Sequence, residues 1–462
     1  MKPAALLLSV LMILGIAACR KDRFTGSSDA QLRPGADTLH FDTVFVSAGS
    51  TSGVVKIFND NEEGIRISSV RLAGGTASPF HINVDGLAGP EVRDLEVAGG
   101  DSLYVFVTVT VNPNSANQPF IVQDSIAIDW NGNRRWVQLD AFGQNARFLR
   151  NHTVRGAETW DNTLPYVILG GLTVDTTARL NITQGTRVYF HADAPLIVHG
   201  QLTAAGDHFD STRVLLTGDR LDVPYRDYPA SWPGVIFSAA SRASTLTYTS
   251  IRNAYQGIVA VGPAPAGQLT LRECVIDNAY DAGLYALGAS IDSRNLLLSN
   301  CGSGIVLLGG NYQFVHTTAA GFSNAFQQHK QPALYFSNTD ESGRPAALNA
   351  VFRNGIYWGE ANGIVPDEVV AAGRSGAPFN VQFDGALWRV RTAPAGVTAT
   401  NILNTTDPGF DSVDNATRYY NLRPAVGSPA VDRGSNSNTP IDLDGKPRPV
   451  GTAPDLGAYE RQ

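Results

Sequence analysis

Hydrophobic residues between positions 243 and 309 occur in short runs that follow one repeated pattern. Each run has six residues and begins and ends with glycine, at 257–262, 283–288 and 304–309. Before each run come an apolar residue, one further residue and an asparagine, which falls at Asn253, Asn278 and Asn300. The asparagines are 25 and 22 residues apart by subtraction of their positions. Short apolar runs at such a period are typical of a solenoid of β-strand coils.

Stacking of equivalent side chains explains why the pattern uses these residue types. Each coil of a β-solenoid pairs with the next at about 4.8 Å. We therefore expect Ile251, Ile276 and Leu298 to form one aliphatic stack inside the solenoid. The three asparagines would form a ladder at a turn, because asparagine tolerates the left-handed conformation and its amide bonds to neighbouring coils. An ordinary β-sandwich with coincidental repeats is the alternative.

These repeats resemble the right-handed parallel β-helix, or pectate-lyase-like, family. The resemblance covers the chain from about Thr163 to its end. It implies a fold and no particular function, because this fold carries lyases, glycosidases, adhesins and proteins without known activity.

Composition supports an all-β class: an immunoglobulin-like β-sandwich followed by a right-handed parallel β-helix with a C-terminal cap. Glycine is plentiful, with 46 residues, and charged residues make up only 17% of the chain. Helix-forming residues do not gather into long periodic runs. The net charge of −7 argues against nucleic acid as a partner, because such partners select basic surfaces.

The first 36 residues predict export and anchoring. Residues 1–18 combine Lys2, a short apolar stretch and small residues, which is typical of a signal peptide. The run 14–19 resembles the bacterial lipobox and implies acylation of Cys19, followed by a flexible tether over 19–36. We expect a partner in the lipid bilayer and a bacterial outer-membrane location, on either the surface or the periplasmic face. A plain secretory signal is the alternative.

Three further segments complete the predicted organisation. Residues 37–146 alternate as short strands and resemble immunoglobulin-like modules of the abnormal-spindle/hydin type, which implies a spacer or partner surface. Residues 150–405 are the predicted β-helix, with an insertion that contains a short helix around 368–372. Residues 406–462 resemble the choice-of-anchor Q segment of β-helix proteins. We interpret this tail mainly as a cap over the open end of the solenoid.

Cysteine and aspartate positions give no clear cofactor. We expect Cys274 and Cys301 to be free, largely buried thiols in different columns of adjacent coils. No zinc spacing is present. The side chains of Asp442, Asp444 and Asp455 are candidate Ca²⁺ ligands, but such aspartates also commonly hold turn backbones. No other cofactor is implied.

Arg272 and Arg294 are the candidate ligand-binding residues. Both lie six residues before an asparagine of the ladder, so we expect them on successive coils. They would share an anion such as a uronate or sulfated sugar, or they are exposed turn arginines. Aromatic candidates for sugar stacking are Trp232, Tyr255, Tyr285, Tyr312 and Trp358.

No motif groups an acid, a base and cations, so the catalytic residues stay unassigned. The sequence favours a lipid-anchored envelope protein that binds glycan or protein along its flank without catalysis. The alternative is a polysaccharide lyase or glycoside hydrolase acting on an acidic polysaccharide in a groove around Arg272, Arg294 and residues 311–400. A purely structural envelope component is the third possibility.

Overall fold

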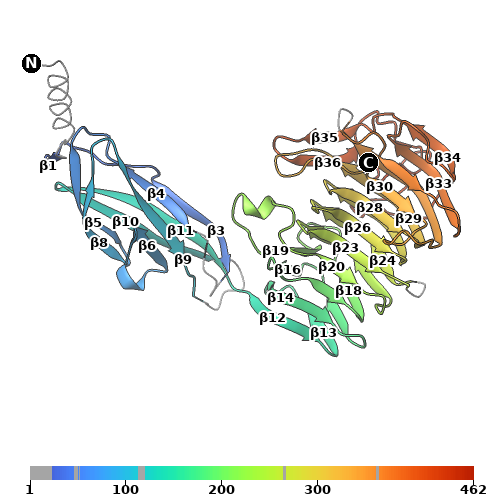
Figure 1. Ribbon diagram of the computed structural model, residues 1–462, viewed down its shortest axis with the longest axis horizontal. Helices are drawn as coiled ribbons and strands as arrows, with labels where there is room; N and C mark the ends of the chain where they lie inside the picture. Colours follow the sequence, from blue (N-terminus) through green and yellow to red (C-terminus); the bar gives the residue numbers. More distant parts are fainter. Residues whose placement is uncertain (1–22, 46–49, 51, 113–119, 264–266, 361–363) are drawn as a thin grey trace, which may run out of the picture. The chain divides into compact units, whose positions relative to one another are not determined.

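The computed structural model describes residues 23–45, 50, 52–112, 120–263, 267–360 and 364–462. The chain divides into two compact units, Met1–Asn145 and Ala146–Gln462 (Figure 1). Both units consist of strands and loops, with two short 3₁₀ helices in the described residues, η1 (Gly75–Ala77) and η2 (Tyr225–Asp227). Within this part of the chain, no helix is both long and apolar enough to cross a bilayer.

The first unit is a β-sandwich of two sheets. One sheet contains β1 (Phe24–Thr25), β3 (Thr38–Phe45), β5 (Gly64–Leu72), β8 (Glu91–Val97), β10 (Phe120–Trp130) and β11 (Asn133–Gln144). The other contains β2 (Arg33–Pro34), β4 (Gly53–Phe58), β6 (Phe80–Val84), β7 (Leu87–Ala88) and β9 (Ser102–Val109). Alternate residues of the strands, such as Val105, Val107 and Ile128, are buried between the sheets in one core. The sandwich follows from this period-2 pattern, as in other layered β domains.

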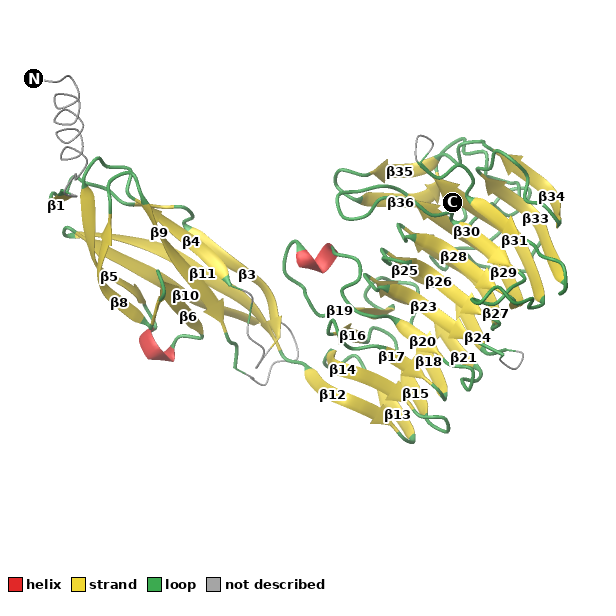
Figure 2. Cartoon of the chain, viewed as in Figure 1, coloured by secondary structure: helices red, strands yellow, loops and turns green. Residues whose placement is uncertain are grey.

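The second unit is a parallel β-helix built from one continuous ladder of 23 strands. Its strands are β12 (Arg147–Val154), β13 (Ala157–Trp160), β14 (Tyr166–Val174), β15 (Arg179–Ile182), β16 (Arg187–Phe190), β17 (Leu196–Val198), β18 (Gln201–Ala205), β19 (Val214–Gly218), β20 (Val235–Phe237), β21 (Ser244–Thr247), β22 (Thr249–Arg252), β23 (Gln256–Val261), β24 (Leu269–Arg272), β25 (Val275–Asp277), β26 (Ala282–Leu287), β27 (Ser290–Ser299), β28 (Ser303–Leu308), β29 (Gly310–Gly321), β30 (Leu334–Ser337), β31 (Leu348–Gly359), β32 (Val369–Ala372), β33 (Phe379–Trp388) and β34 (Val397–Asn404). Each strand pairs in parallel with its equivalent in the next coil (Figure 2). The all-β class and the parallel β-helix solenoid predicted from the sequence are confirmed.

Strand register places the repeated residues in single columns. Ile251 pairs with Ile276, and Ile276 pairs with Leu298, as the repeat predicted. All three side chains are buried in a core that extends from the first coil to the last. Equivalent apolar side chains of successive coils stack on one another, and this stacking keeps the interior of the solenoid filled.

The asparagines form a ladder at the turn after β22, β25 and β27. Asn253, Asn278 and Asn300 have φ values of 61°, 58° and 52°. Asn278 Nδ2 donates a hydrogen bond to Asn253 Oδ1 over 2.8 Å. The register continues this column as Gly321 and Gly359. Asn278 Oδ1 and Asn300 Oδ1 accept no hydrogen bond, so the bonded pair is Asn253 and Asn278, and the asparagine column ends where the next two coils have glycine.

The space above the two glycines holds a buried charged cluster. His329 Nε2 lies 3.0 Å from Glu368 Oε1, and Arg389 Nη2 donates to the same oxygen over 2.7 Å. A Cβ atom at Gly359 would overlap both the Glu368 carboxylate and the His329 ring. The change from asparagine to glycine along the column thus makes room for this cluster.

A second column of left-handed turn residues was not predicted. Register aligns Glu273, Asn295, His316, Asn354, Gly385 and Asn401. All six have positive φ, between 51° and 74°. In the first of these coils this turn column lies between β24 and β25, and its first four members are buried. Each of these six coils therefore requires a residue that tolerates the left-handed conformation at this point.

Two local expectations have different outcomes. Cys274 and Cys301 are free and buried, as predicted, and burial raises the pKa of each thiol to about 12. The helix expected at 368–372 is wrong, because residues 369–372 form strand β32. Val369 pairs with Leu334 of β30 and is buried in the core. Pairing with the preceding coil overrides the local helix preference of this segment.

The tail packs along the flank of the solenoid. It contains a two-stranded hairpin, β35 (Phe410–Asp414) and β36 (Tyr419–Pro424). An outward column on the coils, formed by Val275, Leu297, Thr318, Ile356, Leu387 and Leu403, is mostly apolar. Tail residues Leu422, Ala430, Leu443, Leu456 and Ala458 cover this column in a separate core. These contacts are lateral, and closure of the open end by the tail stays a prediction.

Gly359→Ala is expected to lower the free energy of unfolding by about 1–3 kcal/mol, because the added methyl overpacks the His329–Glu368–Arg389 cluster. Urea unfolding of the full chain, followed by circular dichroism, measures this change. Gly156→Ala is the matched control, since a Cβ there meets no atom within 4 Å. Equal midpoints for the two variants would contradict the packing described for Gly359.

Candidate functional site

Arg272 and Arg294 lie side by side on β24 and β27, in register. Their charges are nevertheless compensated within the chain. Arg272 Nη2 lies 2.6 Å from Asp292 Oδ2, and Arg294 Nε lies 3.6 Å from the buried carboxylate of Glu273. Burial is the main cause that raises the pKa of Glu273, and Asn295 hydrogen bonding and the arginines oppose it. An acidic sugar would have to compete with these internal partners.

A shallow groove of about 400 Å³ lies next to the two arginines, on the outer face of β27, β29, β31 and β33. It falls within the region where the sequence placed a possible groove. Side chains that line it include Ser290, Asp292, Asn311, Gln313, Asn349, Asn380 and Gln382. Five of these seven are carboxamides, and those five are exposed. We call this surface the amide groove.

A row of asparagines runs across the amide groove. Register aligns Asn311, Asn349 and Asn380 on three successive coils. Asn349 Nδ2 donates to Asn311 Oδ1 over 2.9 Å, and Asn380 Nδ2 donates to Asn349 Oδ1 over 2.8 Å. These bonds fix the orientation of each amide, while the remaining donor and acceptor positions face solvent. The row is therefore an ordered, uncharged array of donors and acceptors.

The amide groove contains few groups that could act as a general acid or base. Among the described residues that line it, Asp292 is the one carboxylate, and it is paired with Arg272. Glycosidases generally use two carboxyl groups at a defined separation. In the described part of the chain, no three His, Cys, Asp or Glu side chains are arranged to hold a metal ion. The described lining of the groove therefore does not supply such a pair of carboxyl groups.

The structure separates the aromatic candidates by exposure. Trp232, Tyr312 and Trp358 are buried, so their rings are part of the packing. Tyr285 is half-buried, and its hydroxyl donates to Glu341 Oε1 over 3.2 Å. Tyr255 is 46% exposed and is the candidate whose ring is most available to a sugar.

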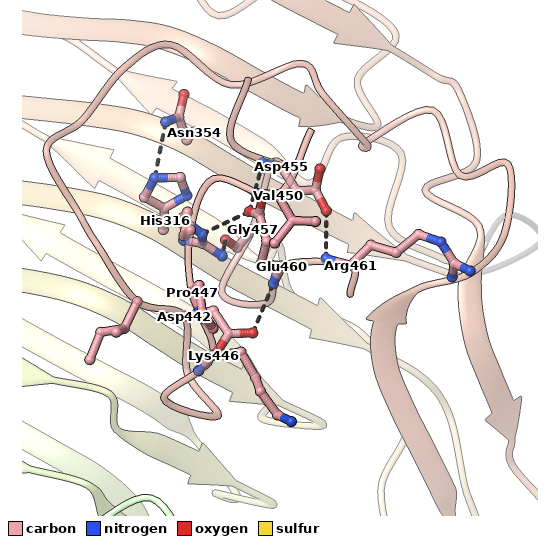
Figure 3. Close-up of polar contacts among 12 residues, drawn as sticks. His316, Asn354, Asp442, Lys446, Pro447, Val450, Asp455, Gly457, Glu460 and Arg461 are labelled. Carbon is pink, nitrogen blue, oxygen red and sulfur yellow. Dashed lines mark hydrogen bonds and ion pairs between the residues drawn. The ribbon is translucent and has the colours of Figure 1, made fainter. Parts of the chain in front are cut away.

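The candidate calcium ligands hold turn backbones. Asp442 Oδ1 accepts hydrogen bonds from the amides of Asp444 and Lys446, and its Oδ2 accepts from the amide of Glu460 (Figure 3). Asp455 similarly accepts from the amides of Asp432 and Arg461, and the Asp444 carboxylate pairs with Arg423. Burial raises the pKa of Asp442 and Asp455. These oxygens thus shape the tail.

A buried polar interface joins the tail to the turn column. Arg448 Nε donates to Glu460 Oε2, and Arg448 Nη1 donates to Asn295 Oδ1, both over 2.9 Å. Asn354 Nδ2 donates to the carbonyl of Ser435 over 2.7 Å and to His316 Nε2 over 3.1 Å (Figure 3). The side chains that satisfy the left-handed turns therefore also bind the tail.

His316 is the histidine of the turn column. Its Nε2 lies 2.7 Å from Ser437 Oγ, and the ring is buried. Burial, together with the charge of Arg448, holds the pKa of His316 well below its ordinary value of 6.5. The imidazole is therefore neutral in the folded protein at neutral pH.

Cys19, the predicted acylation site, lies outside the described residues. The signal peptide and residues 19–22 of the predicted tether lie there as well. The rest of that segment, residues 23–36, is described: it contributes β1 and β2 to the sandwich and places Leu32 in the sandwich core, so this part of the expected flexible tether is structured.

Comparisons with known proteins give limited similarity. No family model matches the chain, and no curated protein matches it significantly. A family 123 glycoside hydrolase from Clostridium perfringens is 10% identical, with a TM-score of 0.18, and the match covers 25% of this chain and 26% of that one. The chain thus spans about a quarter of that enzyme's length.

Two other solved structures are similar at the same low level. The PapD-like domain 7 of human CEP192 is 9% identical, with a TM-score of 0.18, covering 28% of this chain and 90% of that one. The catalytic unit of a family 87 α-1,3-glucanase from Streptomyces thermodiastaticus is 11% identical, with a TM-score of 0.24, covering 79% and 89%. Scores at this level carry no argument about function.

His316→Asn is expected to reduce the loss of stability on acidification. Because the folded-state pKa lies below 6.5, the unfolded chain takes up the proton first, so folding stability falls as pH drops below about 6.5. At pH 5.5 this histidine costs on the order of 1 kcal/mol relative to pH 7.5, and asparagine removes that cost. Urea unfolding at both pH values measures the difference.

The comparison of wild type with His316→Asn isolates this residue. Asp442, Asp455 and Glu460 have raised pKa values, so their contribution changes in the opposite direction, but it is common to both proteins. Asparagine occupies the same column at 295 and 354, so it suits the turn. An identical pH dependence in both proteins would contradict a buried neutral His316.

Proposed function

We propose that the β-helix unit binds a neutral polysaccharide in the amide groove and does not cleave it. The observation that carries this proposal is the row formed by Asn311, Asn349 and Asn380, which is exposed and internally ordered. Sugar hydroxyls both donate and accept hydrogen bonds. Carboxamides at the coil spacing offer both functions without charge.

Electrostatics favour a neutral ligand over an acidic one. Arg272 and Arg294 have carboxylate partners in Asp292 and Glu273. The net charge of −7 adds long-range repulsion toward a polyanion. The remaining exposed groups of the groove are mainly amides and the hydroxyl of Ser290.

Anchoring at the bacterial envelope completes the proposal. The lipobox-like run that ends at Cys19 supports acylation of this residue and attachment to the outer membrane. The sandwich unit would then act as a spacer between the anchor and the polysaccharide-binding coils, in the manner of the immunoglobulin-like modules that it resembles.

Asn349→Ala is expected to weaken binding about tenfold, because it removes a ligand contact and both bonds that order the row. Affinity electrophoresis of the full chain through gels containing xylan, β-glucan, mannan or pectate measures the retardation. Asn181→Ala is the control, since this half-buried amide on β15 is far along the chain from the groove residues.

Two results would contradict the proposal. One is wild-type retardation by pectate alone, which would indicate an acidic ligand. The other is release of reducing ends or unsaturated products from the retained polymer, which would indicate an enzyme. Asn349→Ala that is retarded as strongly as wild type would exclude the amide row as the site.

Cys19→Ser is expected to move the protein from the detergent phase to the aqueous phase in Triton X-114 partitioning of expressing bacteria, because diacyl anchoring is lost. Ser27→Ala, in the same N-terminal region, is the control. If Cys19→Ser stays in the detergent phase, anchoring through Cys19 is contradicted.

A further inference from the structure

A second exposed surface lies at a different turn of the coils. Five aromatic residues border the asparagine ladder: Tyr225, Tyr228, Tyr255, Tyr280 and Phe326. We call this surface the aromatic rim. It is separated from the amide groove by strands β23 and β26, because the ladder turn precedes these strands and the groove follows them.

Two tyrosines of the rim occupy successive coils. Tyr255 and Tyr280 each lie two residues after a ladder asparagine, and their ring centroids are 5.7 Å apart with an interplanar angle of 28°. They are 46% and 53% exposed, so much of each ring contacts solvent. Core packing therefore does not account for their exposed surfaces.

The ladder positions the rest of the rim. Asn253 Nδ2 donates to the carbonyl of Arg226 over 2.7 Å, and Asn278 Nδ2 donates to the carbonyl of Asp227 over 3.0 Å. These bonds hold the loop that contains η2 against the turn (the short helix beside β19 in Figure 2). The same asparagines that stabilise the solenoid thus hold Tyr225 and Tyr228 beside it.

Two other segments converge on the same turn. Gln327 Nε2 donates to the carbonyl of Tyr280 over 3.0 Å, and the Phe326 ring packs 4.8 Å from the Tyr228 ring. Arg418, at the tip of the β35–β36 hairpin, lies 4.6 Å from the Phe326 ring and pairs with Asp227. Binding sites usually form where several loops meet on a rigid scaffold.

Polar groups accompany the exposed rings. Gln256 Nε2 donates to Asp281 Oδ2 over 2.7 Å, next to the two tyrosines in sequence. Arg252 is exposed one residue before Asn253. Aromatic rings can stack on the apolar faces of sugars, and amide, carboxylate and guanidinium groups can hydrogen-bond to sugar hydroxyls. The combination of these groups on one surface suits an oligosaccharide.

We infer that the aromatic rim is a second carbohydrate-binding site, which holds a glycan by stacking on Tyr255 and Tyr280. This inference rests on the proposed function, since both sites would bind glycan. The two sites differ in chemistry, because the rim uses aromatic faces and the groove uses amides. A polymer that reaches both would gain avidity from the rigid solenoid between them.

The test compares double variants of the full chain in affinity gels containing xylan, β-glucan or mannan. Tyr255→Ala/Tyr280→Ala is expected to weaken retardation about tenfold. Tyr104→Ala/Phe106→Ala is the control, because it removes another exposed, stacked aromatic pair on the sandwich unit. Tyr255→Phe/Tyr280→Phe should retain most of the binding, since it keeps the stacking faces.

The outcomes separate the two sites. A loss in Tyr255→Ala/Tyr280→Ala, with the control unchanged, supports the rim. If Tyr255→Ala/Tyr280→Ala is retarded like wild type while Asn349→Ala loses binding, the rim is not a binding site. The proposed function of the amide groove is then unaffected. A wild-type chain that none of these polymers retards overturns both. Circular dichroism of each variant verifies that lost binding does not reflect lost folding.

Discussion

The coils of the β-helix from β24 to β34 share a left-handed residue at one turn. Glu273, Asn295, His316 and Asn354 provide this conformation on four successive coils. A backbone turn inside a stacked structure leaves polar groups that need partners, and an unpaired buried group is costly. The polar side chains of the column, and the tail that lies on them, supply these partners. The tail is therefore part of the solenoid's stability and not an appendage.

Lateral packing of the tail also determines which surfaces stay available. The apolar column that includes Leu297, Ile356 and Leu387 is covered by tail residues. The amide groove and the aromatic rim stay exposed on other parts of the same coils. The hairpin of the tail reaches the rim through Arg418, which contacts Asp227 and Phe326. Stability and candidate function thus share the same turn residues, especially Asn253 and Asn278.

The sequence predicted the parts of the fold in which one residue type repeats. Ile251, Ile276 and Leu298 recur with asparagine at a constant offset, so their column could be found by spacing alone. The turn column was missed because its members change from Glu273 to Asn295 to His316 while only φ is shared. One signal was present: arginine immediately precedes Glu273, Asn295 and Asn354.

The site was only partly predictable for similar reasons. Arg272 and Arg294 were correctly expected on successive coils, but their pairing with Asp292 and Glu273 depends on side-chain geometry. The asparagines of the groove are 38 and 31 residues apart, because loops of different length separate their coils. No fixed period connects them, so their alignment appears only in three dimensions. The strand at 369–372 shows the same limit, since its pairing partner lies a whole coil earlier.

The most direct measurement is a crystal structure of the protein soaked with an oligosaccharide prepared from a neutral polymer that retards it. We expect an intact sugar chain in the amide groove, hydrogen-bonded to Asn311, Asn349 and Asn380. A cleaved sugar beside a pair of carboxylates, or an ordered chain with no contact to these asparagines, would contradict it.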